Sequence, residues 1–144
     1  MAESSGKNKL VLKSHAISIE LAQQMLNRAE EAKANTYPTA HGGYACTVLT
    51  ANGAIYEGVS YKSDTYTLTM HCEMTALANA AIHGEKDIIA ITGPNCHMCK
   101  QIIWESALKS GNDIQIIMEK DGKIIRVPIS SLMQYAWPDA EGRH

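Results

Sequence analysis

Apolar positions along the chain follow two different periods, and the change from one to the other predicts its elements. From residue 14 to residue 35, apolar side chains recur at helical spacing, which predicts a helix with one face that covers a sheet. The members of this face are Ile17, Leu21, Met25, Ala29 and Ala32. The following residues, 36–43, contain Pro and Gly and predict a loop.

Two hairpins are predicted from pairs of short apolar runs. Residues 44–50 and 54–60 flank Ala51-Asn52-Gly53, and Asn-Gly between two such runs is a strong hairpin signal. Residues 113–119 and 123–129 flank Lys120-Asp121-Gly122 in the same way. Four of the expected strands therefore form two antiparallel pairs.

The middle of the chain predicts a helix, a strand and a second helix. Residues 71–84 are apolar nearly all round and end in Gly84, so we expect a central, buried helix. Residues 87–92 form a short apolar strand, residues 94–112 a helix that stops near Gly111, and residues 130–135 a last short helix. The strand-helix-strand order implies one parallel pair. We expect an α/β domain over residues 14–138, in which helices enclose a mixed five-stranded sheet, with mobile ends at 1–13 and 139–144.

Composition narrows the choice of partner and compartment. The 144 residues carry 13 Lys+Arg against 15 Asp+Glu, a net charge of −2, and the basic residues are scattered, which opposes a nucleic-acid partner and favours a small molecule. The sequence has neither an apolar run long enough for a membrane span nor a visible secretory signal, so we expect a cytoplasmic protein with reduced thiols. Its four cysteines then serve in metal binding, catalysis or packing.

Two short motifs carry candidate chemistry, and each alone is ambiguous. His71-Cys72-Glu73 begins the central helix, where an isolated His-x-Glu is usually structural. Cys96 and Cys99 begin the next helix, where a Cys-x-x-Cys serves as a redox pair, a metal clip or simple packing. We interpret Cys46, Trp104 and Trp137 as core residues, and His97 either as a pocket residue or as a solvated one.

The two motifs together are more specific. Both lie at predicted N-termini of consecutive helices, and such ends stabilise the thiolates that bind metal. One histidine and two cysteines with a fourth position open are typical of catalytic zinc. A nearby carboxylate, here Glu73, is the acid and base that such a site needs.

H-x-E followed by C-x-x-C is the known signature of zinc deaminases, and the chain resembles the cytidine deaminase superfamily. It looks most like the small cytidine and blasticidin S deaminases, over residues 36–137. The resemblance implies their three-layer α/β/α fold, Zn²⁺ held by His71, Cys96 and Cys99, and Glu73 as the proton carrier. It also implies hydrolytic release of ammonia from cytidine, deoxycytidine or an analogue such as blasticidin S, by a homotetramer or dimer.

The substrate-binding residues depart from that family. Ser60 and Lys62 align with the Asn and Glu that hold ribose in relatives, and Gly42 aligns with the Phe that packs on the base. Asn95 precedes Cys96, where relatives have Pro. We predict substrate contacts from Ser60 and Lys62, the latter to a carboxylate or phosphate, with exposure to solvent as the alternative. Cys72 is interpreted as a packing residue, with substrate contact as the alternative.

Other functions are weighed against this one. They are deamination of another small aminated heterocycle, a catalytically silent zinc-binding relative, deamination of a nucleic-acid base, and a redox dithiol. The acidic balance and the Asp121-Gly122 hairpin oppose the nucleic-acid role. Glu73 opposes a silent metal clip, which has no use for an acid there. A redox dithiol is expected to purify largely free of metal.

Overall fold

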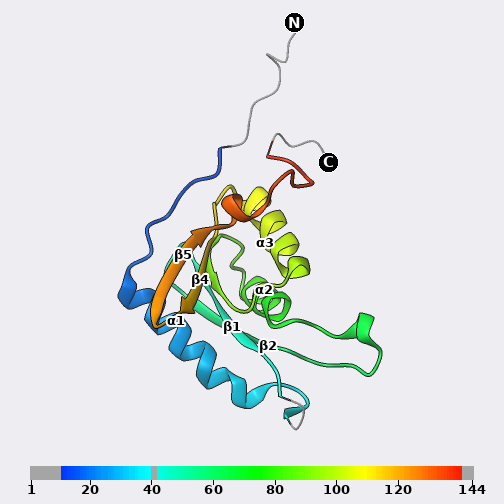
Figure 1. The fold of residues 1–144 in the computed structure, drawn as a ribbon. Helices are drawn as coiled ribbons and strands as arrows, with labels where there is room; N and C mark the ends of the chain where they lie inside the picture. Colours follow the sequence, from blue (N-terminus) through cyan, green and yellow to red (C-terminus); the bar gives the residue numbers. More distant parts are fainter. Residues whose placement is uncertain (1–10, 40–41, 141–144) are drawn as a thin grey trace, which may run out of the picture.

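A five-stranded sheet, in the order β2-β1-β3-β4-β5, forms the middle layer of the protein (Figure 1). The computed structural model describes residues 11–39 and 42–140. The strands are β1 (Ala45–Thr50), β2 (Ile55–Val59), β3 (Ile88–Thr92), β4 (Gln115–Lys120) and β5 (Lys123–Pro128). β3 and β4 run parallel, whereas the other three neighbouring pairs are antiparallel. The predicted mixed sheet with a final antiparallel hairpin is confirmed.

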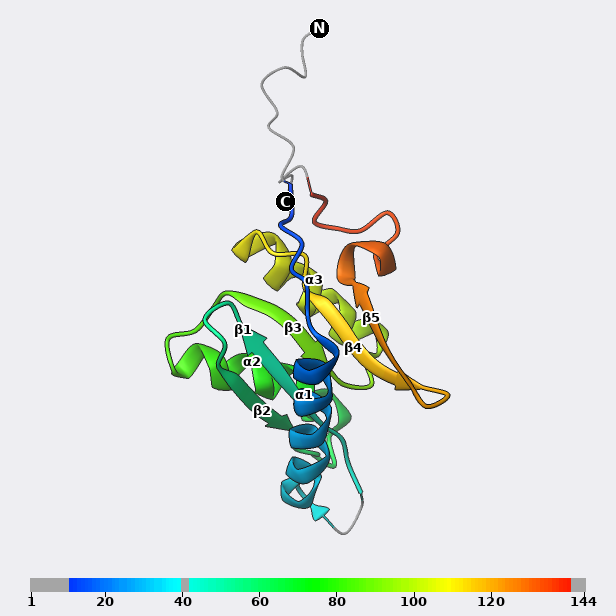
Figure 2. The ribbon, with the colours of Figure 1, turned by 90° about the vertical axis from the view of Figure 1, so that its left-hand side faces the viewer.

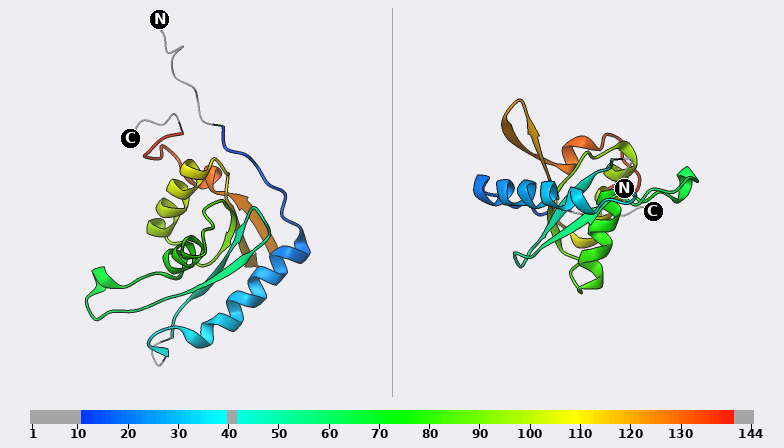
Figure 3. Two further views of the ribbon diagram at one scale, coloured as in Figure 1. Left: turned by 180° about the vertical axis from the view of Figure 1, so that it is seen from behind. Right: turned by 90° about the horizontal axis from the view of Figure 1, so that it is seen from below.

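Helices cover both faces of this sheet (Figures 2 and 3). α1 (Ile19–Ala32) lies on one face, and α2 (Cys72–Ile82) and α3 (His97–Ser110) lie on the other. Consecutive strand residues divide between the two cores: Leu49 and Ile117 face α1, while Val48 and Ile116 face α2 and α3. The side-chain alternation of the strands therefore builds the predicted three-layer α/β/α architecture.

Helix boundaries follow local capping chemistry. α1 begins after Ser18, whose hydroxyl accepts the Leu21 N–H at 3.1 Å, so the helix starts later than its apolar pattern suggested. Ile17 precedes the helix and is nevertheless buried against it. α3 ends at Gly111, which has the left-handed backbone (φ 79°) of a helix C-cap.

The segment between β2 and α2, residues 60–70, projects from the body of the protein, and we call it the arm (Figures 1 and 3). The arm contains the 3₁₀ helix η4 (Tyr66–Leu68), and its two ends pair through Tyr61 and Met70. The Tyr61 N–H donates to the Met70 carbonyl at 2.9 Å, and the Met70 N–H returns the bond at 2.8 Å. The base of the arm is therefore a short antiparallel ladder.

Some expectations are corrected. α2 is not the buried helix that was expected, since it is buried on one face only and Ile82 is 82% exposed. Trp137 is 69% exposed and is not a core residue, whereas Trp104 lies in the core as expected. The last short helix is the 3₁₀ helix η5 (Ile129–Leu132), and a further 3₁₀ turn, η2 (Lys33–Asn35), follows α1.

Only parts of the two predicted mobile ends can be compared with the structure. The predictions for residues 1–10 and 141–144 lie outside the described residues. Lys13, in the described part of the N-terminal end, pairs with the backbone on both sides of Asn112. Among the described residues, no helix is long and apolar enough to cross a membrane.

Candidate active site

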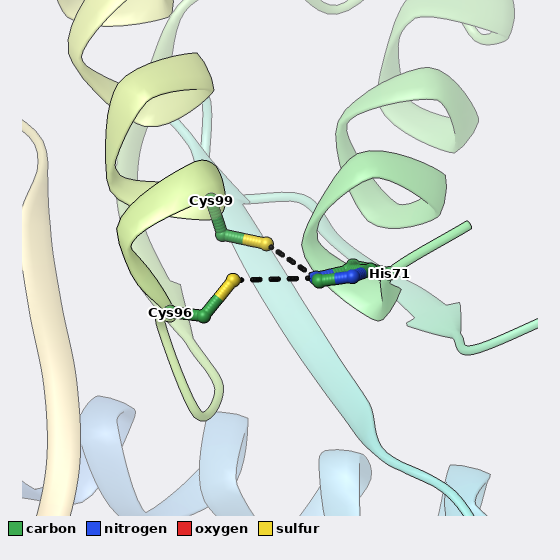
Figure 4. A group of neighbouring side chains, drawn as sticks. All are labelled: His71, Cys96 and Cys99. Carbon is green, nitrogen blue, oxygen red and sulfur yellow. Dashed lines mark hydrogen bonds between the residues drawn. The ribbon is translucent and has the colours of Figure 1, made fainter. Parts of the chain in front are cut away.

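Three side chains from the N-termini of α2 and α3 converge (Figure 4). His71 is the N-cap residue of α2, Cys96 is the N-cap of α3, and Cys99 follows in the first turn of α3. His71 Nδ1 lies 3.2 Å from Cys99 Sγ and 3.3 Å from Cys96 Sγ. The predicted meeting of the two helix ends is confirmed.

The close contact of α2 with β2 sets the position of His71 and Glu73. A Cβ on Gly58 of β2 would lie 2.3 Å from both the Ala76 nitrogen and the Cys72 oxygen, so only glycine lets the first turns of α2 lie this close to the strand. The Thr75 hydroxyl adds a bond to the Val59 carbonyl at 2.8 Å. β2 therefore serves as the platform on which the start of α2 is fixed.

The three converging side chains fit a zinc ion. One atom of each, the His71 nitrogen and the two sulfurs, can be chosen so that all lie within 4.8 Å of one another. Zinc bonds of about 2.0–2.3 Å in a tetrahedron place neighbouring ligand atoms about 3.5 Å apart, close to the distances found here. Two thiolates and a neutral imidazole balance the charge of Zn²⁺. Three protein ligands leave the fourth position of a tetrahedron open.

Glu73 lies beside this group and is 1% exposed. Its Oε1 accepts hydrogen bonds from the Cys72 and Cys99 thiols at 3.2 and 3.3 Å. Its Oε2 accepts the backbone N–H of Asn95 at 2.7 Å. The carboxylate is thus held next to the metal-binding group and shielded from bulk water.

Burial changes the acidity of two cysteines around Glu73. Removal from water, followed by the charge of Glu73, raises the pKa of the Cys99 thiol well above its ordinary value. A hydrogen bond with Cys72, together with burial, raises the pKa of Cys46, which lies in the core as expected. Without metal, Cys99 is therefore a neutral thiol at physiological pH, and metal binding must displace its proton.

A cavity of about 260 Å³ opens onto these groups. Its wall is largely apolar, and it is lined by members of the metal-binding group, by Glu73 and by residues of the arm. The lining residues are Tyr44, Ser60, Lys62, Thr69, Met70, His71, Cys72, Glu73, Pro94 and Cys96. This volume lies just below the range of about 300–1,000 Å³ that is usual for small-molecule pockets.

The predicted substrate-binding residues all line this cavity, but they differ in burial. The Ser60 hydroxyl accepts the Tyr44 N–H at 3.1 Å and is almost fully buried. Lys62 is half-buried, and its backbone N–H donates to the Tyr37 carbonyl at 2.8 Å. Cys72 is buried with its thiol on Glu73. Whether any of them contacts substrate stays a prediction.

Sequence reasoning missed the residues that shape the site through their backbone. Gly58 was assigned only to a strand and Gly93 only to a connection, and Asn95, at the start of a predicted helix, was noted only because relatives have Pro there. A glycine inside an apolar strand is the one signal that could have identified Gly58, since it marks a close backbone approach. His97, considered for the pocket, is exposed and does not line it.

The fold and the metal-binding group define a zinc-dependent hydrolase of the deaminase class, and comparison with known proteins identifies its family. Residues 19–111 match the sequence model of the cytidine and deoxycytidylate deaminase zinc-binding region. This match covers more than half of the chain, and the chain belongs to that family. It is 27% identical over 92 residues to a cytidine deaminase of Halalkalibacterium halodurans, covering 58% of this chain and 70% of that protein.

Solved structures share the fold at low sequence identity. The cytidine deaminase of Burkholderia pseudomallei has a TM-score of 0.69 at 19% identity, over 80% of this chain and 98% of that one. The Bacillus anthracis cytidine deaminase has a TM-score of 0.62 at 20% identity, over 81% of this chain and 89% of that one. The expected cytidine deaminase-like fold is therefore confirmed.

Proposed function

We propose that His71, Cys96 and Cys99 bind Zn²⁺ and that Glu73 carries protons in the hydrolytic deamination of a small aminated heterocycle. The observation that carries this proposal is the placement of a buried carboxylate directly against three converging zinc-type ligand atoms at the end of a cavity. Neither a structural metal clip nor a redox dithiol requires that carboxylate. Membership in the deaminase family supports the same assignment.

The proposed reaction is a hydrolysis, and it needs neither an oxidant nor a reductant. When bound, zinc supplies the activation of a water molecule, because it lowers the pKa of that water toward neutrality. Glu73 accepts a proton as water adds to the amino-bearing carbon of the substrate. It passes this proton to the ring nitrogen, and then takes the second proton from the hydroxyl group formed on the substrate carbon and delivers it to the departing amine. The C–N bond breaks, a C=O bond forms, and ammonia leaves.

The proposed substrate is a free aminopyrimidine nucleoside or a compound of similar size, with cytidine and deoxycytidine first and blasticidin S as an analogue. The cavity of about 260 Å³ and its largely apolar wall suit a flat heterocycle. The net charge of −2 opposes a nucleic-acid substrate.

Ammonia release from cytidine and deoxycytidine by zinc-loaded protein tests this proposal, with Glu73→Ala as the blank. We expect release from at least one of them, and a loss of about 10²–10⁴-fold in the variant because proton transfer is removed. Release from neither substrate, with one zinc per chain, would reject the cytidine assignment and direct the search to blasticidin S and other aminated heterocycles. Equal release by wild type and Glu73→Ala would contradict the role of Glu73.

A second candidate substrate carries a carboxylate or phosphate, because Lys62 lines the cavity beside Ser60 and Thr69. A charge-assisted bond of about 1.5–3 kcal/mol corresponds to roughly 10- to 100-fold in KM. Lys62→Ala should therefore raise KM for deoxycytidylate by that factor and leave KM for deoxycytidine within about threefold, with Lys123→Ala, on exposed β5, as the control. An unchanged KM for deoxycytidylate would show that Lys62 does not contact the phosphate of the substrate.

We also propose a homo-oligomer, dimer or tetramer, in the cytoplasm. Tyr66 in the arm is 89% exposed, and Leu68, Ile82, Met98 and Trp137 are exposed too, so a second chain has large apolar side chains to cover. The four unpaired cysteines suit a reducing compartment. Light scattering should give a mass of two or four chains, and a mass of one chain at micromolar concentration would contradict the oligomer.

A further inference from the structure

The turn that joins β3 to α3 packs directly against the Glu73 carboxylate. A Cβ on Gly93 would lie 2.9 Å from Glu73 Oε2 and 3.1 Å from the Cys46 Cβ. The backbone at Gly93 also has a φ of 137°, which side chains rarely adopt. Glycine at this position therefore makes room for the carboxylate.

Asn95, two residues further on, supplies a hydrogen bond to the same oxygen. Its backbone N–H donates to Glu73 Oε2 at 2.7 Å, the short distance typical of a bond to a charged acceptor. Asn95 itself has a left-handed backbone, with a φ of 55°. Asn tolerates that conformation better than most residues, and its Nδ2 closes the turn on the Gly93 carbonyl at 3.0 Å.

The two oxygens of Glu73 consequently have different surroundings. Oε2 is held by the Asn95 N–H, whereas Oε1 contacts the Cys72 and Cys99 thiols. Cys99 belongs to the metal-binding group, so Oε1 is the oxygen next to the reacting atoms.

We infer that Asn95 is a positioning residue, whose N–H fixes Oε2 so that Oε1 is the atom that accepts and returns protons. This inference rests on the proposed role of Glu73. For Glu73 the backbone of Asn95 matters more than its side chain, because the backbone N–H bonds the carboxylate, whereas Nδ2 bonds the Gly93 carbonyl and the buried Oδ1 has no hydrogen-bond partner among the described residues. Glycine meets both backbone requirements, whereas proline lacks the N–H and cannot adopt a positive φ.

Zinc-loaded Asn95→Pro and Asn95→Gly test the inference with the substrate that wild type deaminates. Loss of a hydrogen bond to a charged group changes a rate constant by a factor of roughly 10–100. Asn95→Pro should therefore lower kcat by that factor. Its KM should stay within about threefold of the wild-type value, and it should still bind one zinc per chain. Asn95→Gly should stay within about threefold of wild type in kcat. Gly93→Ala, whose methyl group presses on Oε2, should also lower kcat, and it replaces the proline variant if that fails to fold.

Asp121→Pro is the matched control, because Asp121 also has a positive φ (54°) but lies in the exposed β4–β5 turn. It should lower the stability and leave kcat unchanged. Wild-type kcat in Asn95→Pro, or an equal fall in Asn95→Gly, would overturn the inference. Full turnover by Glu73→Gln would instead overturn the proposed function.

A readout without substrate completes the test. The Asn95→Pro substitution should lower the urea midpoint of unfolding more with Glu73 present than in the Glu73→Ala background, because the backbone strain is common to both and the lost bond exists only with Glu73. Asp121→Pro should lower it equally in both backgrounds. An equal loss for Asn95→Pro in both backgrounds would show that the bond to Glu73 does not position the carboxylate.

Discussion

The cavity is lined by two regions that are built in different ways. They are the fixed end, at the starts of α2 and α3, and the arm, residues 60–70. At the fixed end, His71, Cys99 and Glu73 come from the first turns of two helices, and each is held by contacts of about 3 Å. The second region is the arm, which contributes Ser60, Lys62 and Thr69 to the cavity lining, projects from the body (Figure 1) and bears exposed apolar side chains. If the fixed end carries the chemistry and the arm the substrate choice, as proposed, substitutions in the two regions should have different effects.

Removing a ligand at the fixed end should have the largest effect. Cys99→Ala takes one of two thiolates from the metal-binding group, so zinc content should fall from about one per chain to near zero and ammonia release should fall to background. Cys72→Ala is the matched control, because Cys72 is also buried next to Glu73 but lies outside that group, and it should keep its zinc. Loss of zinc from Cys72→Ala would contradict this, because it would mean that Cys72 is itself a zinc ligand. Metal content measured by plasma emission decides between these outcomes.

Crowding the platform beneath the fixed end should have the next largest effect. Gly58→Ala forces a Cβ to within 2.3 Å of the α2 backbone, and such overpacking should lower the free energy of unfolding by about 3 kcal/mol. Gly53→Ala meets no atom within 4 Å but has a φ of 94°, so strain alone should cost about 1–2 kcal/mol. Urea denaturation measures both, and an equal loss for the two variants would mean that α2 moves away from β2 without penalty.

Zinc affinity should depend on pH in a direction set by Cys99. Burial and the charge of Glu73 raise the pKa of this thiol, so it is protonated without metal and must release a proton when zinc binds. Zinc should therefore bind more weakly as the pH falls, by about tenfold per unit for each proton released. Competition with a chelator between about pH 6 and 8 measures this slope. An affinity independent of pH would contradict a neutral Cys99 thiol.

The smallest effect is expected in the arm, at Ser60. Ser60→Ala removes the acceptor of the Tyr44 N–H, which should cost about 1 kcal/mol of stability. We expect KM to rise by no more than a few-fold and kcat to stay near wild type, because the Ser60 hydroxyl bonds the Tyr44 N–H, whereas Glu73 is held by other groups. Steady-state kinetics checks this, and a loss of kcat as large as that of a Glu73 variant would remove the distinction between the two regions.

The fold was largely predictable because its signals are local. Asn-Gly at 52–53 and Asp-Gly at 121–122 mark the two hairpins, and Gly111 marks the end of α3. The pairing of His71 with Cys96 and Cys99 also followed from sequence, because all three lie at the starts of consecutive helices.

The rest of the site depends on contacts between distant residues. Gly58 meets α2 and the Asn95 N–H meets Glu73 across long sequence separations, and a backbone N–H carries no residue signature. The exposure of Trp137 and of one side of α2 was missed because an apolar pattern does not distinguish a buried core from an exposed apolar surface.

X-ray absorption at the zinc edge of the zinc-loaded protein tests the central claim most directly, since it counts the atoms bound to the metal. His71, Cys96 and Cys99 with an open fourth position predict two sulfur neighbours at about 2.3 Å and two nitrogen or oxygen neighbours at about 2.0–2.1 Å. Glu73→Gln should give the same spectrum, because the carboxylate is not a ligand in this account. Three or four sulfur neighbours, or a protein that binds no zinc, would contradict it.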